Sequence, residues 1–319
     1  MRSIEIDGLR VSRIGLGTWQ FGSREWGYGE AYARETAPAL LRRAIELGIT
    51  MIDTAEAYGP GHSERIIGET LAGVPAADRA GLTIATKLMP LVPAEPIVAW
   101  QAVGSRRRLQ QETLDLYYAH WPNPFVSVRR VMQSLRPLVG EGLVRRVGVS
   151  NYSLAKWRQA ERALRAPVIA NQVKFSLARP DPARDLVPYA AEHDRLVVAY
   201  SPLAQGLLAG DPGWHAVRDF RRRMRPARRT NGLAPLADAV REVAAAHNAT
   251  PAQVALAWVL AHPNTIAIPG ARTLEQLESN AAARTWCWPT TRWRASRPGR
   301  RRSRPDAEPA PDTIGVCRT

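Results

Sequence analysis

The chain has few of the features that mark secreted or membrane-spanning proteins. Its 319 residues include two cysteines, Cys287 and Cys317, which cannot form a disulfide framework for the body of the chain. No apolar run approaches the roughly 18 residues of a membrane helix. The longest candidate, VALAWVLA before His262, is typical of a buried helix. The first residues include Glu5 and Asp7 and have no apolar signal core. We therefore expect a soluble protein of the reducing cytoplasm, with no membrane partner.

Several catalytic motifs are also missing. There is no H-E-x-x-H, and no Cys or His pair stands at metal-ligand spacing with a second pair elsewhere, so we expect no metal site. The G-x-S-x-G motif that carries the nucleophilic serine of α/β-hydrolases is absent. The segment GLGTWQFG does not fit the G-x-G-x-x-G loop of open dinucleotide-binding sheets. These absences argue against metal catalysis, acyl transfer through serine and a Rossmann-type site.

Positive charge is abundant but local. The formal net charge is +15, and residues 218–229 hold seven arginines and one aspartate. Residues 284–319 hold nine more arginines. Basic segments attract polyanions, including phosphorylated cofactors. No helix-turn-helix, zinc-finger or RNA-binding signature accompanies them, so we expect no nucleic-acid partner. A nucleic-acid role for the arginine clusters remains an alternative.

Strand-like and helix-like segments alternate along the chain. Eight β-rich runs are expected, the first ending near residue 18 and the others at 49–53, 82–86, 114–119, 144–149, 168–173, 196–200 and 265–268. Most are spaced like strand–helix units. Between them, the residues 35–48 carry an apolar helical stripe that ends at Gly48. Helix N-caps are predicted at Ser63, Ser153 and Thr250, and a capping box at 273–276.

Eight such units predict an α/β fold, a closed (β/α)₈ TIM barrel. A short N-terminal β-hairpin turning at Asp7-Gly8 precedes it. We assign residues 1–283 to this single domain. The alternative is an open, doubly wound sheet. Residues 284–319 are rich in Arg, Pro and Trp and show no helical stripe. This tail is either a disordered basic segment or an out-of-frame translation of a GC-rich reading frame.

Four side chains at or just after strand ends carry the chemistry: Asp53, Tyr58, Lys87 and His120. In a TIM barrel these strand ends form the active-site face. Tyr58 could donate a proton to a carbonyl oxygen, and the ammonium of Lys87 would lower its pKa. Asp53 would hold Lys87, and His120 could bind the developing negative charge. Taken singly, each of these residue types is more often a packing, capping or solvated residue. Their occurrence together at successive strand ends favours a catalytic role.

The strings DTAEAYG, TKL, LYYAHWP, GVSNYS, NQVKFSL, AYSPLAQGLL and IPGAR, in this order from about residue 3 to residue 283, resemble the aldo-keto reductase family. The resemblance implies a barrel that reduces aldehydes or ketones with NADPH. It makes Asp53, Tyr58, Lys87 and His120 a catalytic tetrad with Tyr58 as general acid. Some members of the family sense cofactor with little turnover, which is the alternative function.

The same resemblance implies a cofactor site. Ser150, Asn151 and Gln172 would hold the nicotinamide carboxamide, and Tyr200 would stack on the ring. Ser201, Leu203 and Gly206 would follow the pyrophosphate. Arg272 would bind the 2′-phosphate, favouring NADPH. The full implied set is Thr18, Trp19, Asp53, Ser150, Asn151, Gln172, Tyr200, Ser201, Leu203, Gly206, Gly270, Arg272, Gln276 and Asn280.

Two further expectations concern affinity and the substrate, a small carbonyl compound. Ser279 departs from the family pattern, in which many relatives have Glu, and this puts cofactor affinity in question. Four aromatic residues are expected to line the substrate mouth: Trp19, Trp26, Tyr28 and Trp121.

Overall fold

The computed structural model describes residues 3–22, 31–210 and 233–283. Four sequence-based expectations lie outside these residues: the positions of Trp26 and Tyr28, the arginine-rich stretch 218–229, and the tail from 284 to 319.

The described chain forms the predicted barrel of eight parallel strands. Their order in the sheet follows the sequence, from β3 to β10. The strands are β3 (Leu16–Gly17), β4 (Met51–Asp53), β5 (Thr83–Leu88), β6 (Leu114–Ala119), β7 (Val144–Ser150), β8 (Val168–Lys174), β9 (Leu196–Tyr200) and β10 (Thr265–Ile268). The ring nearly closes where the Gly15 N–H donates to the Ala267 carbonyl at 2.8 Å. The sequence-based prediction of a TIM barrel is confirmed, and the open sheet is wrong.

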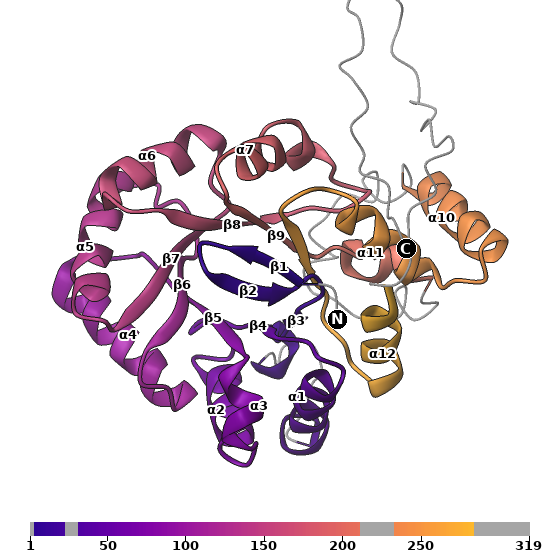
Figure 1. The fold of residues 1–319 in the computed structure, drawn as a ribbon, viewed down its shortest axis with the longest axis horizontal. Helices are drawn as coiled ribbons and strands as arrows, with labels where there is room; N and C mark the ends of the chain where they lie inside the picture. Colours follow the sequence, from indigo (N-terminus) through magenta and orange to yellow (C-terminus); the bar gives the residue numbers. More distant parts are fainter. Residues whose placement is uncertain (1–2, 23–30, 211–232, 284–319) are drawn as a thin grey trace, which may run out of the picture.

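Helices surround the strands, as Figure 1 shows. Helices α10 and α11 both lie between β9 and β10 in the sequence, so this interval holds one helix more than a single strand–helix unit. The helices are α1 (Ala37–Glu46), α2 (His62–Ala72), α3 (Ala76–Ala80), α4 (Glu95–Leu109), α5 (Val128–Gly140), α6 (Leu154–Leu164), α7 (Leu186–Glu192), α10 (Ala234–Ala246), α11 (Pro251–Leu260) and α12 (Leu274–Ala282). Shorter helical turns are η1 (Trp19–Gly22), η3 (Tyr32–Thr36), η4 (Asp181–Arg184) and η5 (Ala204–Ala209).

The N-terminal hairpin is formed by β1 (Ser3–Ile6) and β2 (Leu9–Ser12). Its turn residues, Asp7 and Gly8, have φ of 49° and 67°, the left-handed values that a tight two-residue hairpin turn requires. In Figure 1 the hairpin lies across the middle of the ring of strands. Its apolar residues are buried in one cluster with interior strand residues such as Leu116. The hairpin therefore covers one end of the barrel with apolar side chains.

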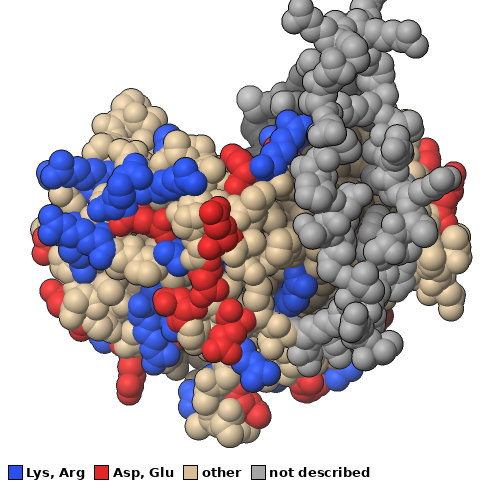
Figure 2. Space-filling view, turned by 45° about the horizontal axis from the view of Figure 1, so that its top comes forward, with Lys and Arg blue, Asp and Glu red and all other residues tan. Residues whose placement is uncertain are grey.

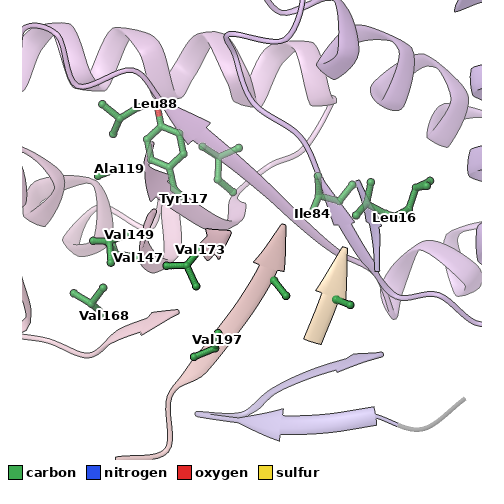
Figure 3. Close-up of a cluster of buried hydrophobic side chains, with 14 of the residues drawn as sticks. Leu16, Ile84, Leu88, Tyr117, Ala119, Val147, Val149, Val168, Val173 and Val197 are labelled. Carbon is green, nitrogen blue, oxygen red and sulfur yellow. The ribbon is translucent and has the colours of Figure 1, made fainter. Parts of the chain in front are cut away.

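The core has two layers because strand side chains alternate between faces. One cluster joins strand residues such as Ile84 to helix residues such as Leu40 and Leu135, and so fills the space between barrel and helices. Figure 3 shows part of this cluster, including Leu88 and Val147. The neighbouring Ala85 belongs to the second cluster, inside the barrel. The interior of the barrel is thus a packed core, and polar chemistry is confined to its rim.

The predicted caps at Ser153 and Thr250 are confirmed, the predicted capping box at 273–276 is present only in its Thr273 half, and the prediction for Ser63 differs. The side chains of Ser153, Thr250 and Thr273 accept backbone N–H groups at the starts of α6, α11 and α12, as predicted. In the predicted box at 273–276, the side chain of Gln276 accepts the N–H of Arg272. The prediction for Ser63 is wrong. The N-cap of helix α2 lies two residues earlier, at Gly61 in the left-handed region, and the Ser63 hydroxyl is buried.

The surface carries both signs of charge. Figure 2 shows Lys and Arg side chains next to Asp and Glu side chains on the face in view. Within the residues that the structure describes, no helix is long and apolar enough to cross a membrane.

Candidate active site

The predicted catalytic residues meet at the carboxyl ends of three neighbouring strands. Asp53 is the last residue of β4, Lys87 lies near the end of β5, and His120 follows β6. Tyr58 is on the loop between β4 and α2. Parallel pairing of β4, β5 and β6 brings these ends to one rim of the barrel. The order of strands in the sheet therefore explains why residues 67 positions apart in sequence are neighbours.

Lys87 and Asp53 form a buried ion pair. The ammonium Nζ lies 2.7 Å from Asp53 Oδ2 and 2.6 Å from the carbonyl oxygen of Thr54. Both side chains are almost fully buried. Burial alone lowers the pKa of Lys87, but the nearby Asp53 carboxylate and Tyr58 raise it above its usual value. Lys87 therefore remains charged at neutral pH, and Asp53 holds that charge at a fixed place in a region of low dielectric.

The Tyr58 hydroxyl lies 3.3 Å from Lys87 Nζ and accepts a hydrogen bond from it. The sequence analysis expected this ammonium to lower the pKa of Tyr58. The structure gives the opposite net result: burial raises the pKa of Tyr58, and Lys87 offsets only part of that shift. The reason is that the phenolate would lose its hydration in this site. Tyr58 is therefore a protonated phenol at neutral pH.

His120 is a neutral imidazole beside the phenol. Its ring packs edge-on against Tyr58, with 6.1 Å between ring centroids. Burial and then the charge of Lys87 lower the pKa of His120 to about 3. On its other side the ring stacks on Trp121, whose side chain is 46% exposed at the rim. Its buried Nδ1 atom has no hydrogen-bond partner within the described residues.

A second polar group occupies the next strand ends around the rim. The Ser150 hydroxyl donates to the carbonyl of Gln172 at 2.9 Å, and the Asn151 amide donates to Ser150 Oγ. The Tyr200 hydroxyl donates to Asn151 Oδ1 at 2.9 Å. Gln172 Nε2 donates to Asp53 Oδ1 at 2.6 Å. This last bond joins the second group to the ion pair, so the two predicted sets form one continuous network.

The backbone near this second group adopts left-handed conformations. Asn151 has φ 62° and Ser201 has φ 49°. In η5, Gly206 has φ 96°, and its N–H donates to the carbonyl of Leu203. Non-glycine residues adopt this region at an energetic cost, and such positions concentrate at ligand-binding sites. The carboxyl ends of β7 and β9 are thus shaped by backbone geometry as well as by side chains.

The remaining predicted cofactor residues lie near the first and last strands. Thr18 is buried, and its hydroxyl donates to the Asp53 carbonyl at 2.8 Å, while Trp19 is 37% exposed. A Cβ on Gly270 would lie 2.8 Å from Gln20 Oε1, so a larger residue here would displace the Gln20 side chain. Arg272 directly precedes the N-cap of α12.

Three of the residues singled out in the sequence lie on α12. Asn280 is buried and its amide donates to the Gly270 carbonyl at 3.4 Å. Gln276 is engaged by the Arg272 backbone. Ser279 Oγ lies 3.2 Å from Thr250 Oγ1, so the serine that stands where many relatives have Glu contacts the N-cap of α11.

The sequence analysis missed three residues that support the site. The Thr54 carbonyl holds Lys87, and the Ser63 hydroxyl bonds to Thr18 and Thr54 at 2.9 Å each. Glu56 accepts the backbone N–H of Met89 at 2.6 Å. A carbonyl group leaves no trace in a sequence. Glu56 is visible in the string DTAEAYG, but the sequence alone does not distinguish it from a solvated loop residue.

No cluster of three or more His, Cys, Asp or Glu residues that could hold a metal ion occurs in the described ranges.

The geometry of this rim can be compared with known proteins. The model of the Aldo/keto reductase family matches residues 13–289. An uncharacterised oxidoreductase of Mycobacterium tuberculosis is 48% identical over 287 residues, covering 89% of this chain and 88% of the relative. A methylglyoxal reductase of Escherichia coli is 35% identical over 283 residues, covering 88% of each chain.

A solved structure agrees with this result. The aldo/keto reductase of Klebsiella pneumoniae in complex with NADP and acetate superposes with a TM-score of 0.71 at 33% identity, covering 88% of each chain. The family match spans most of the described barrel, and the relatives are similar over nearly their whole lengths. The chain therefore belongs to the aldo/keto reductase family of oxidoreductase enzymes.

Proposed function

We propose that this protein reduces an aldehyde or ketone to an alcohol, with NADPH as the hydride donor and Tyr58 as the general acid. One observation carries the proposal: a neutral phenol lies 3.3 Å from an ammonium that is itself held by a buried carboxylate. This arrangement stabilises the phenolate that remains after the proton has left. It serves proton transfer to a carbonyl oxygen better than any other chemistry available at this rim.

The residues of the second group fit the proposed cofactor. Ser150, Asn151 and Gln172 are neutral donors and acceptors, which suits a carboxamide, and the half-buried Tyr200 offers an aromatic ring beside them. The resemblance assigns Gly270 to this site as well. Arg272 stands before a helix N-terminus, a combination that favours phosphate. The resemblance assigns the remaining contacts to Thr18, Trp19, Asp53, Ser201, Leu203, Gly206, Gln276 and Asn280.

The protein's own residues would control the proton. NADPH, when bound, supplies the hydride to the carbonyl carbon. Tyr58 donates its phenolic proton to the carbonyl oxygen, and its raised pKa ensures that this proton is present at neutral pH. Lys87 then stabilises the phenolate through its charge. His120, as a neutral imidazole, carries one N–H that can donate to the same oxygen.

The substrate we propose is a small carbonyl compound. The Escherichia coli relative is named a methylglyoxal reductase. Two aromatic residues, Trp19 and Trp121, are partly exposed, and Trp121 stacks on the ring of His120. Exposed aromatic side chains beside polar groups are common in pockets that bind small organic ligands.

A carbonyl panel tests the proposal. NADPH absorbance would be followed with methylglyoxal, aromatic aldehydes, aliphatic aldehydes and ketones, and in parallel with NADH. We expect NADPH consumption that depends on the carbonyl compound and is weaker with NADH. Tight NADPH binding without consumption by any member of the panel would contradict the reductase and favour a cofactor-sensing protein.

A further inference from the structure

We propose that Glu56 is a positioning residue that sets the distance between the Tyr58 hydroxyl and the Lys87 ammonium. The proposal rests on the proposed function, because that distance matters only if Tyr58 transfers a proton. Glu56 does not touch either group with its side chain. It acts through the loop that carries Tyr58.

Glu56 begins the turn that presents Tyr58. The loop runs from the end of β4 to the start of α2, and the Tyr58 N–H donates to the Ala55 carbonyl at 3.0 Å. The Gly61 N–H donates to the Glu56 carbonyl at 2.7 Å and closes the turn. The position of Glu56 therefore determines the position of the turn that carries the phenol.

Three bonds hold Glu56 in place, and two of them go to the segment that carries Lys87. Its backbone N–H donates to the Lys87 carbonyl at 3.3 Å. Its Oε1 atom accepts the Met89 N–H at 2.6 Å and Gln101 Nε2 at 2.8 Å. Gln101, on α4, also donates to the Met89 carbonyl at 3.3 Å. Glu56 thus joins the Tyr58 turn to the backbone on both sides of Leu88, immediately after the catalytic lysine.

The opposite side of the loop is confined by backbone contact. A Cβ added to Gly59 would lie 2.1 Å from the Gly22 carbonyl oxygen, so the loop and η1 are already in closest approach. The loop therefore cannot come closer to η1, and on its other side the carboxylate of Glu56 ties it to Met89 and Gln101. Loss of that tether allows the Tyr58 hydroxyl to move relative to Lys87, which Asp53 and Thr54 hold in place.

The Tyr58 hydroxyl reports this displacement through its ionisation. The groups around it are Lys87, whose charge lowers its pKa, Asp53, which raises it, the neutral ring of His120, and the phenol of Tyr200, whose own pKa is raised by burial and by Tyr58. A longer distance to Lys87 weakens the one favourable charge. Burial raises the pKa of the Glu56 carboxyl, and its neighbours Glu64 and Arg108 also shift it. Variants that change the charge of Glu56 and its hydrogen bonds separately are therefore needed.

Two variants separate hydrogen bonding from charge. Glu56→Ala removes the acceptor, whereas Glu56→Gln keeps an oxygen that can accept from Met89 and Gln101. We expect Glu56→Ala to lower kcat at least about tenfold with little change in KM, since small misplacement of reacting groups is costly. We expect Glu56→Gln to remain within about twofold of the unaltered protein in kcat. The control is Glu161→Ala on α6, which removes a partly buried carboxylate that pairs with Arg195 and should change stability only.

The ionisation of Tyr58 provides a readout that does not require turnover. In protein labelled with ¹³C at tyrosine Cζ, with Tyr58→Phe to assign the signal, Glu56→Ala should move the Tyr58 titration upward by at least about half a pH unit. Glu56→Gln and Glu161→Ala should leave it unchanged. The proposal is overturned if Glu56→Ala keeps both kcat and the Tyr58 titration, or if Glu56→Gln is as impaired as Glu56→Ala. If the protein reduces no carbonyl at all, the titration still decides the role of Glu56.

Discussion

The two halves of the barrel rim differ in the charge of their side chains. From β4 to β6 the rim holds charge: the ion pair of Lys87 and Asp53 is almost completely buried, beside a phenol and an imidazole with shifted pKa values. From β7 to β9 the second group consists of the neutral side chains of Ser150, Asn151, Gln172 and Tyr200, on a backbone with left-handed residues such as Asn151. A fixed charge is needed to stabilise a developing phenolate, whereas neutral donors suit an amide-bearing ligand. Gln172 joins the halves through its bond to Asp53.

The largest effect is expected from removing the charge of the first half. Lys87→Met leaves the Asp53 carboxylate buried without its cation, which should lower the free energy of unfolding by about 3–5 kcal/mol. Without the ammonium near Tyr58, kcat should fall by about 10²–10⁴-fold. Chemical denaturation and NADPH consumption measure the two effects.

A double variant separates these two losses. Asp53→Asn combined with Lys87→Met removes both charges and keeps an oxygen that can accept from Gln172. We expect much of the stability to return while kcat stays low. Recovery of kcat together with stability would mean that the ion pair acts only on the fold.

The next effect concerns His120 and pH. Its pKa is about 3 in the folded protein and about 6.5 in the unfolded chain, so between these values the unfolded state binds more protons. Stability from this group is therefore complete above pH 6.5 and is lost as the pH falls. The free energy of unfolding should decrease by about 2 kcal/mol from pH 6.5 to pH 5. His120→Gln should remove that part of the slope in denaturation measured across this range. An unchanged slope would place the imidazole in water.

A smaller effect is expected from the second half. Asn151→Gly removes the side chain but tolerates the left-handed backbone at φ 62°. Loss of about one hydrogen bond should raise the Kd for NADPH about tenfold, with kcat at saturation within about twofold. Fluorescence titration gives the Kd. A large fall in kcat with unchanged Kd would reverse the roles of the two halves.

The smallest effect lies outside the rim. Ser153→Ala removes the N-cap of α6 and should lower the free energy of unfolding by about 1 kcal/mol. Neither kcat nor the Kd for NADPH should change. A change in either constant would show that the outer helices influence the site.

Much of the fold could be predicted because its signals are local. Strands such as β6 and β10 coincide with β-rich runs, and Thr250 and Ser153 are visible as caps. Ser63 is a residue type that often caps helices. In this fold it lies inside α2, and its hydroxyl bonds to Thr18 and Thr54. Local preference predicts a cap only where the fold leaves the side chain available.

The site was predicted less completely because its energetics depend on packing. The residue types made Tyr58 and Lys87 candidates, and Lys87 does lower the pKa of Tyr58, but burial reverses the net shift, and burial cannot be read from the sequence. The bonds from Gln172 to Asp53 and from Glu56 to Met89 join residues 119 and 33 positions apart, which no local pattern indicates.

The central claim is that Tyr58 moves the proton while the second half binds the cofactor. It is tested most directly by measuring kcat and the Kd for NADPH on one preparation of Tyr58→Phe. We predict a fall in kcat of at least about 10²-fold with the Kd within about twofold of the unaltered protein. Near-normal kcat with an accepted carbonyl substrate would contradict the account.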